Sequence, residues 1–186
     1  YFVIFVDEYT RYIFIYLMKK RSDLHEIYAV FIADVKQAHS MRIMTLCHQM
    51  ITYEENTPST IRADNAKEYQ KLGRTILQKY GTKMEFTHAH TPQQNGIAER
   101  TNLTLMNKTR AMLFESKLPA NLWGYAVRYS AVTNNATPTR VLDGDNPYYA
   151  WHKYEYKIEN LSLWMFAIHI SRRRIERASY ITELLS

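Results

Sequence analysis

The chain opens on two short runs of apolar, β-branched and aromatic residues separated by a polar break. Phe2–Val6 is continuously apolar, as expected of a strand buried on both faces, and Tyr12–Met18 is a second run of this kind. The segment between them, Asp7–Thr10, is polar, so the two runs predict an antiparallel hairpin. A similar run, Met41–Leu46, predicts a third strand.

Further along the chain, apolar residues recur at helical spacing. Ser22 and Asp23 are suited to cap a first helix. Its predicted apolar face consists of Leu24, Ile27, Tyr28, Phe31 and Val35. A second helix is marked by Tyr69, Leu72, Ile76 and Tyr80 and is expected to end at Gly81. The later predicted elements are a strand over Met84–Thr87, a long helix over Gly96–Ser116, a helix from Leu122 to near Pro138, a helical turn from Asn146 to Trp151 and a strand over Leu163–Ile170. This order predicts an α/β fold in which helices flank a mixed sheet.

Composition narrows the class of protein. A chain of 186 residues with 46% hydrophobic residues fits one domain with its own core. The net charge of +6 and the pI of about 9.3 favour nucleic acid or another polyanion as a partner. The single cysteine, Cys47, excludes a disulfide framework and a Cys/His zinc cluster within the chain. No apolar run reaches about 18 residues, so no membrane span is expected.

Two carboxylates stand out from this background. Asp64 follows a short predicted strand in the segment Ile61–Tyr69, and Glu99 opens the long helix at the end of the segment Thr91–Arg100. Because divalent metal ions prefer carboxylate oxygens, such a pair is suited to hold metal for phosphoryl transfer. Each carboxylate alone has a purely structural explanation. An Asp-Asn pair is common in turns, and the helix dipole favours a Glu in the first turn of a helix. The two motifs together favour the functional interpretation.

These segments resemble the last two acidic positions of the D,D-35-E integrase catalytic core, in the form found in copia-type LTR retrotransposons. Between Asp64 and Glu99 lie 34 residues, one fewer than in the family pattern. Other matching segments are Tyr1–Asp7 with Thr10–Tyr12, Leu118-Pro119 with Leu122-Trp123, and Asn146–Tyr148 with Ala150-Trp151.

The resemblance implies a ribonuclease H-like fold, a mixed sheet with helices on both sides. Aligned with that fold, the chain begins at the second strand, so the first strand is expected to be missing. The resemblance further implies a catalytic core over residues 1–157 and a C-terminal extension over 158–186, with a late strand and a basic tail that includes Arg172–Arg177. In the family the third strand of this chain would run straight into Asp64, so residues 47–58 are interpreted as an insertion.

The same resemblance implies an activity. Asp64 and Glu99 would be catalytic residues and ligands of Mg²⁺ or Mn²⁺, and the intact protein would join element DNA ends to target DNA by transesterification. The family's first acidic position has no counterpart here; Asp7 is expected to organise its turn instead, and Glu68 to be a companion of the ligands. The implied partners are DNA and further copies of the chain, in the nucleus. The alternatives are a non-catalytic nucleic-acid-binding relic and, disfavoured by Thr91–Gly96, a plain ribonuclease H-like nuclease.

DNA contacts are expected on the long helix that Glu99 opens. The candidate residues are Arg100, Asn102, Lys108 and Arg110. Leu103 stands where the family usually has a basic residue, and its presence would remove one phosphate contact.

Overall fold

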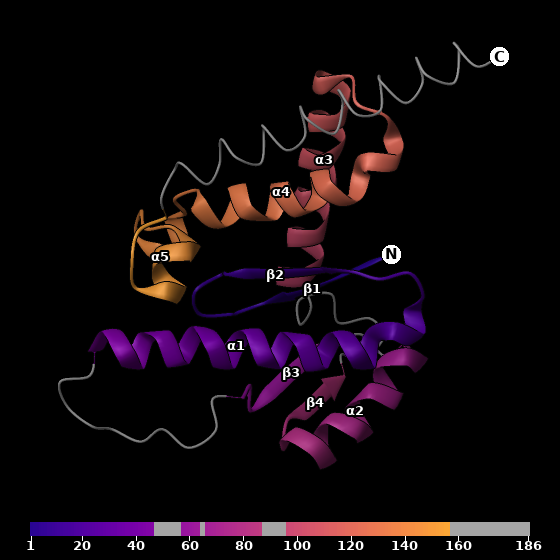
Figure 1. Cartoon of the computed structure of the whole chain (residues 1–186), viewed down its shortest axis with the longest axis vertical. Coiled ribbons are helices and arrows are strands. Elements are labelled where there is room, and N and C mark those ends of the chain that lie inside the picture. The colour runs from indigo at the N-terminus through magenta and orange to yellow at the C-terminus, as the bar shows by residue number, and fades with distance from the viewer. Residues whose placement is uncertain (47–56, 64–65, 87–95, 157–186) are drawn as a thin grey trace, which may run out of the picture.

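The computed structural model describes residues 1–46, 57–63, 66–86 and 96–156, with only the backbone described for 39–46, and shows helices on both sides of a β-hairpin (Figure 1). Its strands are β1 (Phe2–Val6), β2 (Ile13–Leu17), β3 (Thr60–Ala63) and β4 (Lys83–Phe86). Its α-helices are α1 (Leu24–Leu46), α2 (Lys67–Tyr80), α3 (Gly96–Ser116), α4 (Trp123–Ala136) and α5 (Pro147–His152). The described residues also form short 3-10 turns: η1 (Arg21–Asp23), η3 (Ala120–Leu122) and η4 (Arg140–Leu142). The predicted mixed α/β class is confirmed.

The first two strands form the predicted antiparallel hairpin, in which Val3 lies opposite Tyr16. The Asp7 carboxylate organises the turn, because its Oδ2 accepts hydrogen bonds from both the backbone N–H and the hydroxyl of Thr10, each at 2.7 Å. Arg11 completes the turn in the left-handed region, with φ of 61°. The predicted structural role of Asp7 is confirmed.

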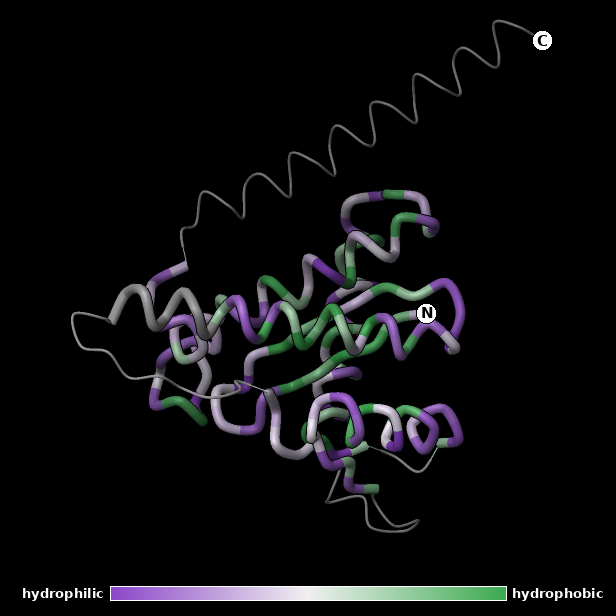
Figure 2. The backbone as a smooth tube through the Cα atoms, turned by 60° about the horizontal axis from the view of Figure 1, so that its bottom comes forward, coloured by the Kyte–Doolittle hydropathy of each residue, from purple (hydrophilic) through white to green (hydrophobic). Residues whose placement is uncertain are grey.

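Each face of the hairpin packs against a different pair of helices, as alternation along a strand requires. One face, which carries Val3, Phe5, Phe14 and Tyr16, lies in a core shared with α1 and α2. The other face carries Phe2, Ile4, Val6, Ile13 and Ile15 and packs against α3 and α4. In Figure 2 the hairpin strands are mostly green, as apolar side chains on both faces require. Burying each large apolar side chain here contributes about 1.5–3 kcal/mol.

The first helix is longer than predicted. Leu24, Tyr28, Phe31 and Val35 are buried, which confirms its predicted apolar face, and the Phe5 and Phe31 rings stack with centroids 4.1 Å apart. The strand predicted over Met41–Leu46 is wrong, because α1 continues to Leu46. No Gly or Pro interrupts the chain between Leu24 and Leu46, and a short apolar run alone does not distinguish a strand from a continuing helix.

The strand that leads to Asp64 is therefore β3 alone. It pairs in parallel with β4, with Ile61 opposite Met84 and Ala63 opposite Phe86. The connecting helix α2 lies close to β4, since a Cβ added to Gly73 would lie 3.2 Å from the Met84 Cβ. As predicted, α2 ends at Gly81, whose φ is 68° and whose N–H bonds the Leu77 carbonyl at 3.1 Å. Of the predicted insertion, residues 47–56 lie outside the described part of the chain.

The helices α3 and α4 pack together on the far face of the hairpin. Leu105 of α3 and Val127 of α4 are fully buried between them and the strands. Asn135 near the end of α4 binds the edge of β2: its Oδ1 accepts from the Ile13 N–H and its Nδ2 donates to the Ile13 carbonyl, both at 2.9 Å. This side chain replaces a neighbouring strand and ties α4 to the hairpin.

The last described helix, α5, begins as predicted at Asn146-Pro147, where the Asn146 side chain accepts the Tyr149 N–H at 2.8 Å. Trp151 is buried and stacks on Tyr12, with ring centroids 5.7 Å apart. The late strand expected over Leu163–Ile170 and the basic tail Arg172–Arg177 lie outside the described residues, as does the expected extension over 158–186.

Candidate active site and nucleic-acid interface

Glu99 lies in the first turn of α3, three residues after the helix begins at Gly96. Leu105, two turns further on, is fully buried against the hairpin and holds the helix in place. The Glu99 side chain is exposed, and no ion pair or hydrogen bond with another described residue engages its carboxylate. An acidic residue in the first turn of a helix also interacts favourably with the helix dipole.

Asp64 lies outside the described residues, but β3, which leads to it, is described. Arg62, two residues earlier, pairs with Glu8 after β1 at 3.1 Å and with Glu85 of β4 at 3.5 Å. The Arg62–Glu8 pair links the hairpin to the second sheet, whereas the Arg62–Glu85 pair lies within that sheet. Each of these exposed pairs contributes about 0–1 kcal/mol of stabilisation. The convergence of Asp64 on Glu99 remains a prediction.

Neighbouring side chains engage two other acidic residues, Asp7 and Glu68. Asp7 is engaged by Thr10, as described above. Glu68 pairs with Arg21 at 3.2 Å. The pKa of Glu68 lies below its usual value, chiefly because of a backbone hydrogen bond and further because of the Arg21 guanidinium.

A divalent metal would need several oxygen donors in one place. Among the side chains that the structure describes, in residues 1–38, 57–63, 66–86 and 96–156, no group of three or more His, Cys, Asp or Glu could hold a metal ion. The donor chemistry of Asp64 and Glu99 suits Mg²⁺ or Mn²⁺, but the described residues do not complete a metal site around Glu99.

The predicted DNA-binding residues of α3 divide into two kinds. Arg100 and Asn102, in the first two turns, are exposed. Lys108 is half-buried and donates from its Nζ to the Asn134 Oδ1 at 2.9 Å, and burial lowers its pKa. Arg110 donates from Nη2 to the Asn107 Oδ1 at 2.6 Å. Leu103 is 60% exposed on this helix.

Two further groups were not predicted from the sequence. Lys67, Lys71 and Arg74 are exposed on α2, and their i, i+4, i+7 spacing was the signal that would have found them. The second group is an aromatic cluster at the end of α5, where the rings of Tyr148 and His152 lie 4.2 Å apart. No sequence spacing indicates that cluster, because tertiary packing brings Tyr12 of the hairpin to it.

Searches for similar proteins point to one group. No family model matches the chain. The chain is 29% identical over 165 residues to the retrovirus-related Pol polyprotein from transposon TNT 1-94 of Nicotiana tabacum, covering 88% of this chain and 11% of that protein. It is 28% identical over 148 residues to the corresponding polyprotein from transposon RE2 of Arabidopsis thaliana, covering 80% of this chain and 9% of that protein. The chain thus spans about a tenth of the polyproteins it matches.

Among solved structures, the fold is similar to that of a chain in the intasome of simian T-cell lymphotropic virus in complex with PP2A regulatory subunit B56 gamma. The TM-score is 0.60 at 17% identity, over 82% of this chain and 48% of that one. At that identity the likeness concerns the fold alone. None of the described helices is long and apolar enough to cross a membrane. By its sequence the chain is similar to the retrovirus-related Pol polyproteins of copia-type transposons, and its fold is similar to that of a chain in a retroviral intasome, which is consistent with a fragment of an integrase core.

Proposed function

We propose that this chain is the part of a retrotransposon integrase core that carries the second and third acidic positions of the catalytic site. In intact form such a core would join element DNA ends to target DNA. The observation that carries the proposal is the placement of Glu99, an exposed carboxylate in the first turn of a helix anchored on the hairpin, with Asp64 directly after β3. DNA would be the substrate, and the protein would act as a multimer in the nucleus.

Asp64 and Glu99 would hold a divalent ion through carboxylate oxygens, with their carboxyl carbons within about 8 Å of each other. When bound, Mg²⁺ or Mn²⁺ supplies activation of the attacking oxygen and stabilisation of the leaving oxygen. The chain would hold these two carboxylates on ordered elements. Asp64 directly follows β3 in the sequence, and Glu99 lies on α3, whose buried side packs on the hairpin. Arg100, which is exposed and follows Glu99 in the chain, would neutralise a DNA phosphate.

The sheet supports a finer proposal about the fold. β1 pairs only with β2, and β3 pairs only with β4, among the described strands. One edge of β1 and one edge of β3 are therefore without a strand partner in the described part of the chain, although the Arg62–Glu8 pair holds the two sheets near each other. We propose that both sheets belong to one ribonuclease H-like sheet, which a further strand completes between β1 and β3.

A second candidate function is binding of nucleic acid without catalysis. It is favoured by one observation: Asp7, at the start of the hairpin turn, already accepts two hydrogen bonds from Thr10. A site with two carboxylates, where the family uses three, would bind metal poorly. Only the basic surfaces would then function, by binding nucleic acid.

A strand-transfer assay with labelled duplex ends, in Mg²⁺ and in Mn²⁺, separates the two functions. Residues 1–186 alone are expected to join no DNA ends, since two acidic positions replace three. Robust joining by the chain, abolished by Glu99→Gln and by Asp64→Asn, would contradict that expectation and show that another residue supplies the third ligand. Addition of a polypeptide that carries the remaining acidic strand is expected to restore joining only while Glu99 and Asp64 are intact. If no joining appears with either metal after that addition, the enzyme proposal fails and the binding function remains.

A further inference from the structure

The helix α2 has two faces of opposite character. Leu72 and Ile76 are buried under it, in the core shared with α1 and β4. On the opposite side Lys67, Lys71 and Arg74 are exposed and follow one another at i, i+4 and i+7. At a rise of about 1.5 Å per residue, the first and last of these three lie about 10.5 Å apart along the helix axis. They form a continuous basic stripe directed away from the core.

No acidic side chain of α2 neutralises this stripe. The helix sequence holds four cationic residues and one acid, Glu68, and Glu68 is already paired with Arg21 at 3.2 Å. Among the described residues, none of the three stripe cations takes part in an ion pair. A stripe of uncompensated charge of one sign attracts a polyanion, and its linear arrangement fits a chain of phosphates.

The cations of the stripe are more available to bind phosphate than two of the predicted DNA-binding residues of α3. Lys108 is half-buried and bonded to Asn134, and Arg110 is bonded to Asn107. Either would have to break a side-chain hydrogen bond before it could neutralise DNA. The α2 cations have no such competitor among the described residues. The helix α2 begins three residues after Asp64 in the sequence, so Lys67 is close in the chain to the candidate metal ligand.

We infer that Lys67, Lys71 and Arg74 form a second contact surface for the phosphate backbone of duplex DNA, separate from the helix that carries Glu99. The inference rests on the proposed function, since it takes DNA as the partner. The surface reads no base sequence, because three flexible cations on an outward helix face provide charge without groups fixed for base edges. Its role is to guide DNA along α2 towards Asp64.

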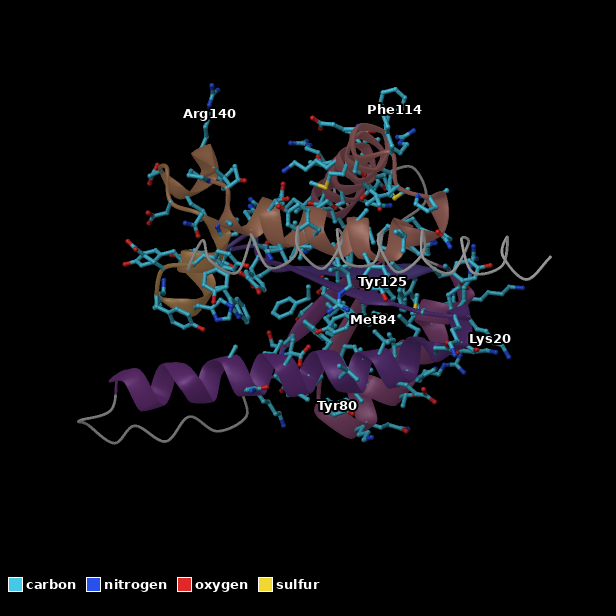
Figure 3. The ribbon with its side chains drawn as sticks, turned by 45° about the horizontal axis from the view of Figure 1, so that its top comes forward. Lys20, Tyr80, Met84, Phe114, Tyr125 and Arg140 are labelled. Carbon is cyan, nitrogen blue, oxygen red and sulfur yellow. The ribbon has the colours of Figure 1, made fainter. Side chains whose placement is uncertain are left out.

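The test compares two triple variants of the full chain by fluorescence anisotropy with a duplex of about 20 base pairs. The stripe variant is Lys67→Gln/Lys71→Gln/Arg74→Gln. The control is Lys117→Gln/Arg140→Gln/Lys153→Gln, which removes the same charge from exposed positions elsewhere. In Figure 3, Arg140 and Tyr80, the last residue of α2, lie on opposite sides of the molecule. Circular dichroism checks that both variants keep the helical content of the parent chain.

The stripe variant should lower the slope of log K against log salt by about 2.7, at about 0.9 per phosphate contact, and weaken binding at low salt by roughly tenfold or more. The control should change the slope by less than about 1. Acetylation of lysines with mass-spectrometric readout should show DNA protecting Lys67 and Lys71 while Lys117 and Lys153 stay reactive.

Equal losses in both variants, or no protection of Lys67 and Lys71, would overturn the inference, since net charge alone would then explain the binding. If Arg100→Gln/Arg110→Gln removes binding while the stripe variant matches its control, the stripe is refuted and DNA binding by α3 stands. If the parent chain binds no duplex DNA at low salt, the inference and the DNA-binding part of the proposed function fail together.

Discussion

Asn135→Ala tests how α4 is tied to the hairpin. Asn135 is 5% exposed and Ile13 is 3% exposed. The wild-type side chain satisfies both the N–H and the carbonyl of Ile13, each at 2.9 Å. Alanine supplies neither partner, so two buried backbone groups lose their hydrogen bonds at once. An unsatisfied buried group costs about 1–3 kcal/mol.

We therefore expect Asn135→Ala to lower the free energy of unfolding by about 2–4 kcal/mol, with some relief from water that enters the space left by the amide. The assay is urea unfolding followed by far-UV circular dichroism. The matched control is Asn102→Ala on α3, which removes an exposed amide of the same type and should change stability by less than about 0.5 kcal/mol.

Asn135→Asp refines the test by a change of one atom. Its carboxylate still accepts from the Ile13 N–H, but it faces the Ile13 carbonyl without a proton to donate. Burial and that carbonyl should raise the folded-state pKa of the new carboxyl, so the loss of stability relative to wild type should be greatest near pH 7. The loss should shrink as pH falls through the folded-state pKa, because the protonated acid can donate. The reasoning is refuted if Asn135→Ala matches Asn102→Ala, or if the Asn135→Asp loss is the same at pH 4 and pH 7.

Three other predictions concern the core, a tyrosine and the DNA face. Leu105→Ala should lower the free energy of unfolding, measured with urea, by about 2.7–5 kcal/mol because Leu105 is fully buried. Leu103→Ala, at an exposed position, should change it by less than about 0.5 kcal/mol. Similar losses in the two variants would contradict the packing of α3. Burial raises the pKa of Tyr12 to about 12, so its stabilising contribution is complete below about pH 10 and is lost between pH 10 and 12. Tyr12→Phe should therefore reduce the fall of the urea midpoint between pH 10 and 12. A fall as steep as in the parent chain would contradict this prediction. Leu103→Lys should strengthen duplex binding and steepen the salt dependence by about 0.9; a salt titration that shows no gain would mean that this face of α3 does not meet phosphate.

The hairpin, α2 and α3 were predictable because local chemistry and tertiary packing agree there. The run Phe2–Val6 is apolar at every position, and the fold covers both of its faces. Gly81 follows an amphipathic helix and takes the left-handed conformation that ends it. The segment Thr91–Arg100 carried the resemblance to integrase cores. It also indicated the start of α3, since an Asn-Gly pair before an apolar-periodic stretch is a local signal.

The sequence alone determined the basic charge and the main described elements, apart from the end of α1, because these depend on neighbouring residues and on side-chain chemistry. It also singled out Asp64 and Glu99, whose role as site residues stays a prediction. Only the tertiary structure decided that Met41–Leu46 continues α1 and that Lys108 and Arg110 are engaged by asparagines. It alone showed that Asn135 binds the backbone of Ile13, 122 residues away. The physical reason is that hydrogen bonds and burial between distant segments have no periodicity in the chain: they exist only after packing brings the partners together, and packing also selects between a strand and a helix where a short apolar run permits both.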